Sequence, residues 1–216
     1  MKLRLIACFV LLGLIALPAF ADQYSVSVGY ADGLRGPGFF PIPWDGAAGV
    51  TFVGGSPGGS FDAGAIMITN ISAAPIIVND ISVNINGFIT DISAWDGHVL
   101  GVGKSLIVTQ TTDFNFDSSD ANFGNVDVGC GVNNGVIPVV TATVDTVATS
   151  FNDSGQVLNT SGYDFACNGS NESFQWRPIG TFGGPAGQTP EPASLMFLGA
   201  GVLGLTRKYW KRSSVA

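Results

Sequence analysis

Basic side chains are scarce in the body of this chain of 216 residues. Between residues 22 and 188 only Arg35, Lys104 and Arg177 are basic, against fifteen acidic side chains, so the net charge of this part is near −12. Nucleic acids and anionic lipids are polyanions, and a surface this acidic repels them. We therefore expect no nucleic-acid partner.

Histidine is almost absent, because His98 is the only one, and every mechanism that uses a histidine base would depend on it. Residues 54–58 match the nucleophile-elbow pattern around Ser56. Asp80, Asp91 or Asp96, followed by His98, would complete the order of a hydrolase triad. That elbow needs a helix after the serine, and the Pro-Gly-Gly at 57–59 is a poor helix start. We expect no enzyme, with a secreted hydrolase using Ser56 and His98 as an alternative.

Cysteine is also rare, with only Cys130 and Cys167 outside the N-terminal 21 residues. In an exported chain two such cysteines predict one disulfide, and two unpaired thiols are the alternative. A zinc site is not expected, since structural zinc usually needs four ligands.

No cofactor is predicted, although one segment has the side chains that calcium prefers. Asp113, Asn115 and Asp117 alternate along the chain and could place three oxygen ligands on one strand face. The spacing does not match an EF-hand, because Ser118 and Gly124 replace the glycine and glutamate of that loop. Solvated side chains at a strand end are the alternative to calcium.

Helical patterns are missing, since no ten-residue window shows an apolar stripe with caps. Period-two patterns are frequent instead, as in residues 81–85, and they predict an all-β antiparallel sandwich over residues 22–182. We expect residues 33–59, rich in glycine and proline, to form an irregular loop. The expected strands are 24–30, 61–69, 76–85, 105–112, 136–147 and 172–179, the last with Phe174 and Trp176 on one face.

The N-terminus has the order of a secretory signal peptide. Lys2 and Arg4 precede an apolar run that ends at Pro18, and Ala19-Phe20-Ala21 supplies the small residues of a cleavage site. Residues 1–21 are therefore predicted to be removed by signal peptidase, with a retained N-terminal anchor as the alternative.

The C-terminus has the order of a membrane stop. Residues 193–205 are almost wholly apolar or small, and four cations follow them. By the positive-inside bias this pattern predicts a transmembrane segment over residues 193–206 with its basic end in the cytoplasm, preceded by a linker at 183–189. A buried terminal helix is the alternative, but the segment has no polar face. The cations are Arg207, Lys208, Lys211 and Arg212.

Pro190, Glu191 and Pro192, the apolar segment and the basic end resemble, in that order, the PEP-CTERM sorting domain of Gram-negative bacteria. The resemblance covers residues 190–216 and implies processing by an exosortase, an integral-membrane enzyme, at or near the Pro-Glu-Pro motif. It also implies a membrane partner and a final place at the cell surface or in an exopolysaccharide matrix.

A second resemblance concerns the body of the chain. The run 64–120 is similar to immunoglobulin-like modules of bacterial surface proteins in its strands and turns, which implies a sandwich and no reaction. We expect a non-enzymatic surface or matrix protein. The alternative from another class is a carbohydrate-binding module for exopolysaccharide, which would use exposed aromatics such as Phe39, Phe40, Trp44 or Trp95.

Overall fold

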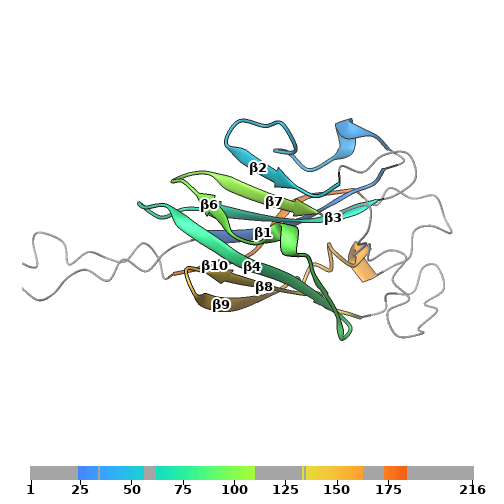
Figure 1. Ribbon diagram of the computed structural model, residues 1–216. Coiled ribbons are helices and arrows are strands. Elements are labelled where there is room, and N and C mark those ends of the chain that lie inside the picture. The colour runs from blue at the N-terminus through green and yellow to red at the C-terminus, as the bar shows by residue number, and fades with distance from the viewer. Residues whose placement is uncertain are drawn as a thin grey trace, which may run out of the picture. The chain divides into compact units, whose positions relative to one another are not determined.

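Two β-sheets lie face to face in the computed structural model of the chain (Figure 1). The structure describes residues 24–33, 35–55, 62–109, 133, 135–162 and 173–183. All of them belong to one compact unit, residues 22–183, and the second unit, residues 1–21 and 184–216, lies outside them. The all-β, sandwich-like fold predicted from the sequence is confirmed for this part of the chain.

The first sheet has the strand order β10-β1-β3-β7-β2. Its pairs are antiparallel except β2 with β7, which are parallel, so the prediction of an antiparallel sandwich is wrong at this edge. The prediction of an irregular loop over residues 33–59 also missed β2, four strand-forming residues between Gly49 and Gly54. The members are β1 (Tyr24–Ala31), β2 (Val50–Val53), β3 (Ala63–Asn70), β7 (Ser105–Thr109) and β10 (Phe174–Phe182).

The second sheet has the order β5-β4-β8-β9, and β6 also pairs with β4. The strand β5 pairs with the second half of β4, and β6 pairs with its first half. The 3-10 helix η2 (Ser93–Trp95) lies between β5 and β6 in the chain. Elsewhere in the described residues the helical turns are η1 (Pro37–Phe39) and η3 (Thr160–Gly162). The members are β4 (Ile76–Ile85), β5 (Phe88–Asp91), β6 (His98–Leu100), β8 (Val139–Val144) and β9 (Val147–Asn152).

The strand predicted over residues 136–147 is two strands, β8 and the start of β9. They form a hairpin whose turn residues Asp145 and Thr146 have φ of 46° and 83°. Two-residue hairpins favour positive φ at both positions because that twist matches the strands. Glycine or asparagine usually marks such a turn, and the sequence has neither here.

The core lies between the sheets and contains the inward side chains of both. The alternation predicted for residues 81–85 is confirmed, since Ile81, Val83 and Ile85 are buried and the residues between them are half-exposed. The side chain of Trp95 extends from η2 into the core, where its Nε1–H donates to the Thr109 carbonyl at 2.9 Å.

The outer face of the first sheet is covered by residues 37–49, here called the cover segment. Trp176 of β10 stacks on Trp44 with ring centroids 5.9 Å apart, and its Nε1–H donates to the Pro43 carbonyl at 2.9 Å. Phe174 packs against the core instead. The prediction that Phe174 and Trp176 share a face is therefore wrong, because a register shift between β1 and β10 adds a residue at this point.

No helix among the described residues is long and apolar enough to cross a membrane. The predicted transmembrane segment 193–206 and the predicted signal peptide 1–21 lie outside the described residues.

Candidate functional site

A β-bulge in β4 aims two neighbouring side chains outward. The pairing of β4 with β8 shifts between Val78 and Asp80, so Asn79 is an extra residue. Asn79 is exposed and Asp80 half-buried, whereas Val78 and Ile81 on either side are buried. Bulges often re-aim a side chain beside a functional site. Here the bulge brings Asp80 to the sheet edge between β5 and β6.

Two more carboxylates reach this gap from the chain that connects β5 to β6. Asp91 ends β5 opposite Ser82, and Asp96 follows η2, where its backbone N–H donates to the Ser93 carbonyl. Burial of Trp95 in the core fixes the turn that carries Asp96. Carboxylate oxygens of Asp80, Asp91 and Asp96 lie within 4.8 Å of one another, and we call these residues the acidic triad.

The triad is electrostatically unfavourable without a cation. Partial burial, followed by the charge of Asp91, raises the pKa of Asp80. Burial, followed by the charges of Asp80 and Asp91, also raises the pKa of Asp96, although the Ile81 N–H and His98 act in the opposite direction. One buried oxygen of Asp96, Oδ1, accepts no hydrogen bond from the described residues.

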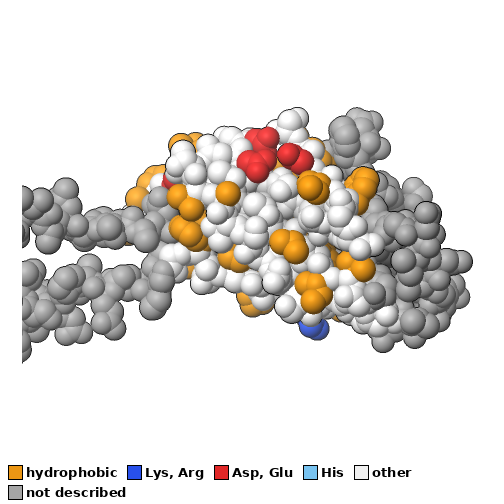
Figure 2. Space-filling model, turned by 90° about the horizontal axis from the view of Figure 1, so that it is seen from below, with side chains coloured by type: hydrophobic (Ala, Val, Ile, Leu, Met, Phe, Trp, Pro, Cys, Tyr) orange, Lys and Arg blue, Asp and Glu red, His pale blue; other side chains and the backbone are white. Residues whose placement is uncertain are grey.

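The triad has the ligand type that hard cations prefer. Calcium binds six to eight oxygens, and three aspartates supply part of that set. Figure 2 shows acidic side chains in one group on a face that is otherwise mostly uncharged. The arrangement can therefore attract a divalent cation, and it can equally act as a repulsive acidic edge. The sequence pattern offered these aspartates only as alternative acids of a hydrolase triad. It did not predict that they lie together, because the bulge and η2, which bring them together, leave no signal in residue spacing.

A second cluster, of aromatic rings, lies under the cover segment. Trp44 contacts Phe40, Phe52 and Trp176 with ring centroids 5.6, 5.3 and 5.9 Å away, respectively. Gln175 joins this segment to β10, since its amide donates to the Phe40 carbonyl and accepts from the Ile42 N–H. The rings of Trp44 and Trp176 are half-buried, and Phe40 is buried.

Of the aromatics expected to bind sugar, two are unavailable. Trp95 is fully buried and Phe40 is 4% exposed, so neither can stack on a ligand. Phe39 is exposed, but among the described residues the rings that contact Trp44 are those of Phe40, Phe52 and Trp176, which are at most half-exposed. The carbohydrate-binding alternative therefore loses part of the surface on which it depended.

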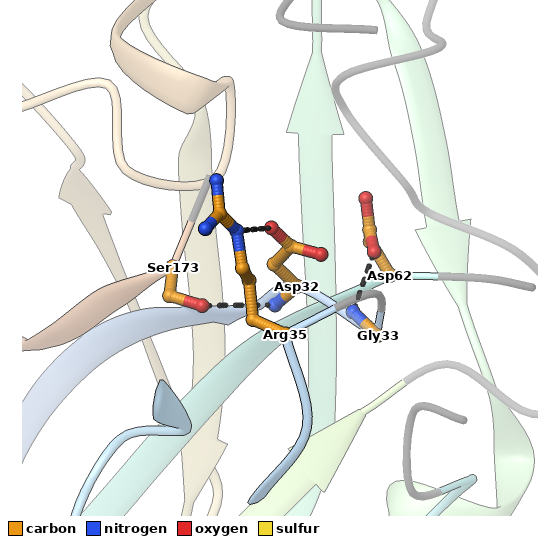
Figure 3. A network of polar contacts seen from close by, with 5 residues as sticks. All are labelled: Asp32, Gly33, Arg35, Asp62 and Ser173. Atoms are coloured by element: carbon orange, nitrogen blue, oxygen red, sulfur yellow. Dashed lines mark hydrogen bonds and ion pairs between the residues drawn. The ribbon is translucent and has the colours of Figure 1, made fainter. Parts of the chain in front are cut away.

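A polar network joins three loops at the end of β1 (Figure 3). The Asp32 N–H donates to Ser173 Oγ at 3.2 Å, and the Gly33 N–H donates to Asp62 Oδ1 at 2.6 Å. Arg35 Nε lies 3.6 Å from the buried carboxylate of Asp32. Because the bonds of Asp32 to Ser173 and of Gly33 to Asp62 join segments distant in sequence, the network fixes loops.

His98 lies at the start of β6 and not in a free turn. It pairs with Val78 in the sheet, and its ring Nε2 lies 3.0 Å from the Ala94 carbonyl oxygen. Ser56, its partner in the hydrolase alternative, lies outside the described residues. The same holds for the other predicted sites, namely the calcium ligands 113–117, Cys130 and Cys167, the 190–192 motif and the cations 207, 208, 211 and 212.

The comparisons with known proteins concern the C-terminal tail. Residues 188–212 match the family model of the PEP-CTERM protein-sorting motif. The chain carries this sorting motif. The match includes Pro190, Glu191 and Pro192 together with the four cations, so the PEP-CTERM resemblance predicted from the sequence is confirmed. No curated protein and no solved structure matches the chain.

The PEP-CTERM motif implies export, membrane association during sorting and processing by an exosortase membrane enzyme. The match covers the tail and does not extend to the sandwich. The function of the sandwich must therefore be inferred from the residues at its own surface.

Proposed function

We propose that this chain is an exported, non-enzymatic protein of the cell surface or exopolysaccharide matrix, retained and then processed through its C-terminal sorting signal. The match of residues 188–212 to the PEP-CTERM motif carries this proposal. The body that the tail delivers is a β-sandwich with all its described strands inside residues 22–183. An immunoglobulin-like relationship of this sandwich to bacterial surface modules is part of the proposal.

The two ends of the chain supply the route. Residues 1–21 direct export and are removed by signal peptidase, and residues 193–206 stop in the membrane with the basic cluster on the cytoplasmic side. Exosortase then cuts at or near Pro190-Glu191-Pro192. These steps rest on the sequence pattern and on the matched motif.

A disulfide between Cys130 and Cys167 stays a prediction for the oxidising compartment. Its support is the hydrogen bonding of the described residues nearest to the two cysteines. Asn133 Nδ2 donates to the Ser161 carbonyl at 2.7 Å and to Gln156 Oε1 at 2.8 Å. Cys130 precedes Asn133 by three positions, and Cys167 follows Gly162 by five. Intact mass before and after reduction tests it, with a gain of two hydrogens expected.

A carbohydrate-binding module is the second candidate, favoured by the half-buried ring pair Trp44 and Trp176. Aromatic faces stack on apolar ligand faces, and an exopolysaccharide is the available ligand in a matrix. Binding of purified matrix polysaccharide that is lost in Trp44→Ala and kept in Phe39→Ala would favour this candidate. A hydrolase using Ser56 and His98 remains an alternative, tested by the activity of Ser56→Ala.

The sorting proposal is tested by expressing the full chain in a Gram-negative host with and without its exosortase. With the enzyme, we expect released protein whose intact mass lacks the cations 207–212. Without it, the uncut chain stays in the membrane fraction. A double variant, Pro190→Ala with Pro192→Ala, should behave like the strain without the enzyme, whereas the upstream control Pro185→Ala should be processed normally.

Released protein that retains the cations 207–212 would contradict processing at the motif. A chain truncated after residue 189 that reaches the same destination would contradict the sorting role of the tail.

A further inference from the structure

Half of the exposed large aliphatic and aromatic side chains among the described residues lie at one end of the sandwich. Five of ten such side chains, between 42% and 67% exposed, belong to this group. Figure 2 shows hydrophobic side chains grouped at the left edge of the domain. We call the group the apolar rim; its members are Ile71, Ile77, Val99, Val102 and Val147.

Register and hydrogen bonds place the rim on adjoining turns. The turn after Leu100 meets the end of β3, because the Gly103 N–H donates to the Asn70 carbonyl and Asn70 Nδ2 donates to the Leu100 carbonyl. Ile77 pairs with Val99 across β4 and β6.

The β8–β9 turn joins the same end. The Asp145 N–H donates to the Ile77 carbonyl at 2.9 Å, and Asp145 Oδ1 accepts from the Ile77 N–H at 2.9 Å. Val147 follows this turn directly. The side chains of the rim thus come from three turns and strand ends that are bonded to one another.

The described chain also enters and leaves the sandwich at this end. Tyr24, the first residue of β1, pairs with Asn70 of β3 and with Phe182 of β10. The chain after Phe182 leads to the sorting signal, so the rim and the exit of the tail lie at the same end of the sandwich.

The distance from this exit to the apolar segment is limited by the chain itself. Ala193 comes eleven positions after Phe182. Even a fully extended chain of that length spans at most about 36–40 Å. A tail held in the membrane therefore keeps the rim close to the lipid surface.

Charged side chains of the described residues lie at both ends of the sandwich. Lys104, which is exposed, and Asp145, whose carboxylate is bonded to the backbone, lie on the turns of the rim, and the acidic triad lies beyond the pair of Val78 and His98. Asp32, Asp62 and Asp153 lie at strand ends on the opposite side, where Ala31 pairs with Ala63 and Val139 with Asn152, and Arg35 lies beside Asp32 there. Anionic lipid attracts the exposed lysine beside the rim.

We propose that the apolar rim rests on the lipid surface of the membrane while the tail is anchored; this rests on the proposed membrane stop at residues 193–206. Aliphatic side chains gain free energy on leaving water for the interfacial region. The contact is weak alone, but the tether makes it intramolecular and so raises its effective concentration. Once the tail is cut, the rim dissociates from the lipid surface, and the sandwich is released from the membrane.

The test uses the full chain in lipid nanodiscs of phosphatidylethanolamine and phosphatidylglycerol, at one chain per disc. Hydrogen exchange is followed in peptides covering 71–77, 99–104 and 145–147, and in the segment 193–205. The rim variant combines Ile71→Ser, Val99→Thr and Val102→Ser. The control combines Ile89→Thr and Ile137→Ser, exposed side chains away from the rim. Protection factors correct for the changed intrinsic rates.

We expect several-fold slower exchange in the rim peptides of the wild type and control than in those of the rim variant, with equal protection of β1 and β3 as the measure of folding. Protection of 193–205 with equal rim exchange in all three proteins would overturn the lipid contact and leave the anchor intact. Unprotected 193–205 would overturn both. Rim protection that appears only with several chains per disc would assign the rim to a second copy of this chain and overturn the lipid contact.

Discussion

The two sheets differ in what lies on their outer faces. On the first sheet Gly29, Ala65 and Ile107 are buried although they lie outside the central core, because the cover segment and neighbouring side chains exclude water. On the second sheet the outward residues of β8, Thr141 and Thr143, remain half-exposed. Apolar residues and glycine at outward positions thus accompany a cover, and hydroxyl-bearing residues accompany an open face. Changes on the first sheet should consequently cost more than similar changes on the second.

The largest effect is expected from Trp176→Ala. The substitution removes the stack on Trp44 and the hydrogen bond to Pro43. Large-to-small changes of buried aromatics cost about 3–5 kcal/mol of stability, and we expect a loss of about 3 kcal/mol for this half-buried ring. Denaturant unfolding measures the loss of stability. The control Ile89→Ala, at an exposed position of the second sheet, should change stability by less than about 0.5 kcal/mol. Equal losses in both variants would show that residues 37–49 add no stability.

Gly29→Ala should be the next most harmful change. A Cβ built on Gly29 would lie 2.8 Å from Pro41 Cγ and 3.0 Å from Trp176 Cε3. Overpacking of this kind costs typically about 1–3 kcal/mol. At Gly101 an added Cβ meets no atom closer than Lys104 Cγ at 3.6 Å, so Gly101→Ala is the matched control in thermal unfolding. A harmless Gly29→Ala would mean that the cover segment shifts easily.

The same hydroxyl pair occurs in both sheets and allows a direct comparison. Thr69 and Ser105 lie opposite each other in the first sheet, 2.8 Å apart and partly buried, and Thr141 and Ser150 in the second, 2.9 Å apart and exposed. Ser105→Ala should cost about 1 kcal/mol because the Thr69 hydroxyl loses a partner away from water. Ser150→Ala should cost less than about 0.5 kcal/mol, since water replaces the lost bond. A larger loss of stability for Ser150→Ala than for Ser105→Ala would contradict this difference between the two sheets.

The smallest effect, with opposite sign, is expected at the acidic triad. The pKa of Asp96 is raised in the folded state, so its contribution to stability is present at acidic pH and is lost as pH rises through that pKa. Asp96→Asn removes the charge and keeps an acceptor for the Ile81 N–H. Its melting temperature at pH 7 should exceed that of the wild type, and the gain should vanish near pH 3. The matched control is Asp45→Asn, at an exposed acid of the cover segment.

Calcium sharpens this measurement. If a cation occupies the triad, added Ca²⁺ raises the melting temperature of the wild type, and Asp96→Asn abolishes the rise. Without such a rise the triad is a repulsive edge only. A gain from Asp96→Asn that persists at pH 3 would contradict charge repulsion as its cause.

Strands with clear alternation could be predicted from the sequence, and regions shaped by bulges could not. The pattern of Ile81, Val83 and Ile85 predicted their burial correctly. The spacing of Phe174 and Trp176 failed because one inserted residue in a bulge reverses the faces of every later side chain.

The sorting motif of the tail could be predicted from the sequence, and the clustering of the acidic triad could not, for a physical reason. A sorting signal is recognised as a linear order of residues, and the order at 190–212 is present in the sequence. The triad depends on a bulge at Asn79 and on a buried Trp95, which bring together carboxylates up to sixteen positions apart. Tertiary packing, and not local spacing, creates it.

The pairing of β10 has a mechanical consequence for a protein that is sorted at a membrane through its tail. The tail leaves from Phe182, and Phe182 is paired with Tyr24, the first described residue of β1. A pulling force through the tail acts on this terminal pair first, and Pro178 farther along β10 has no N–H to add to the ladder. The hydrogen bonds between β10 and β1 then break one after another, starting from the pair of Tyr24 and Phe182. The sandwich would therefore yield to tension at its tail strand long before its central strands separate.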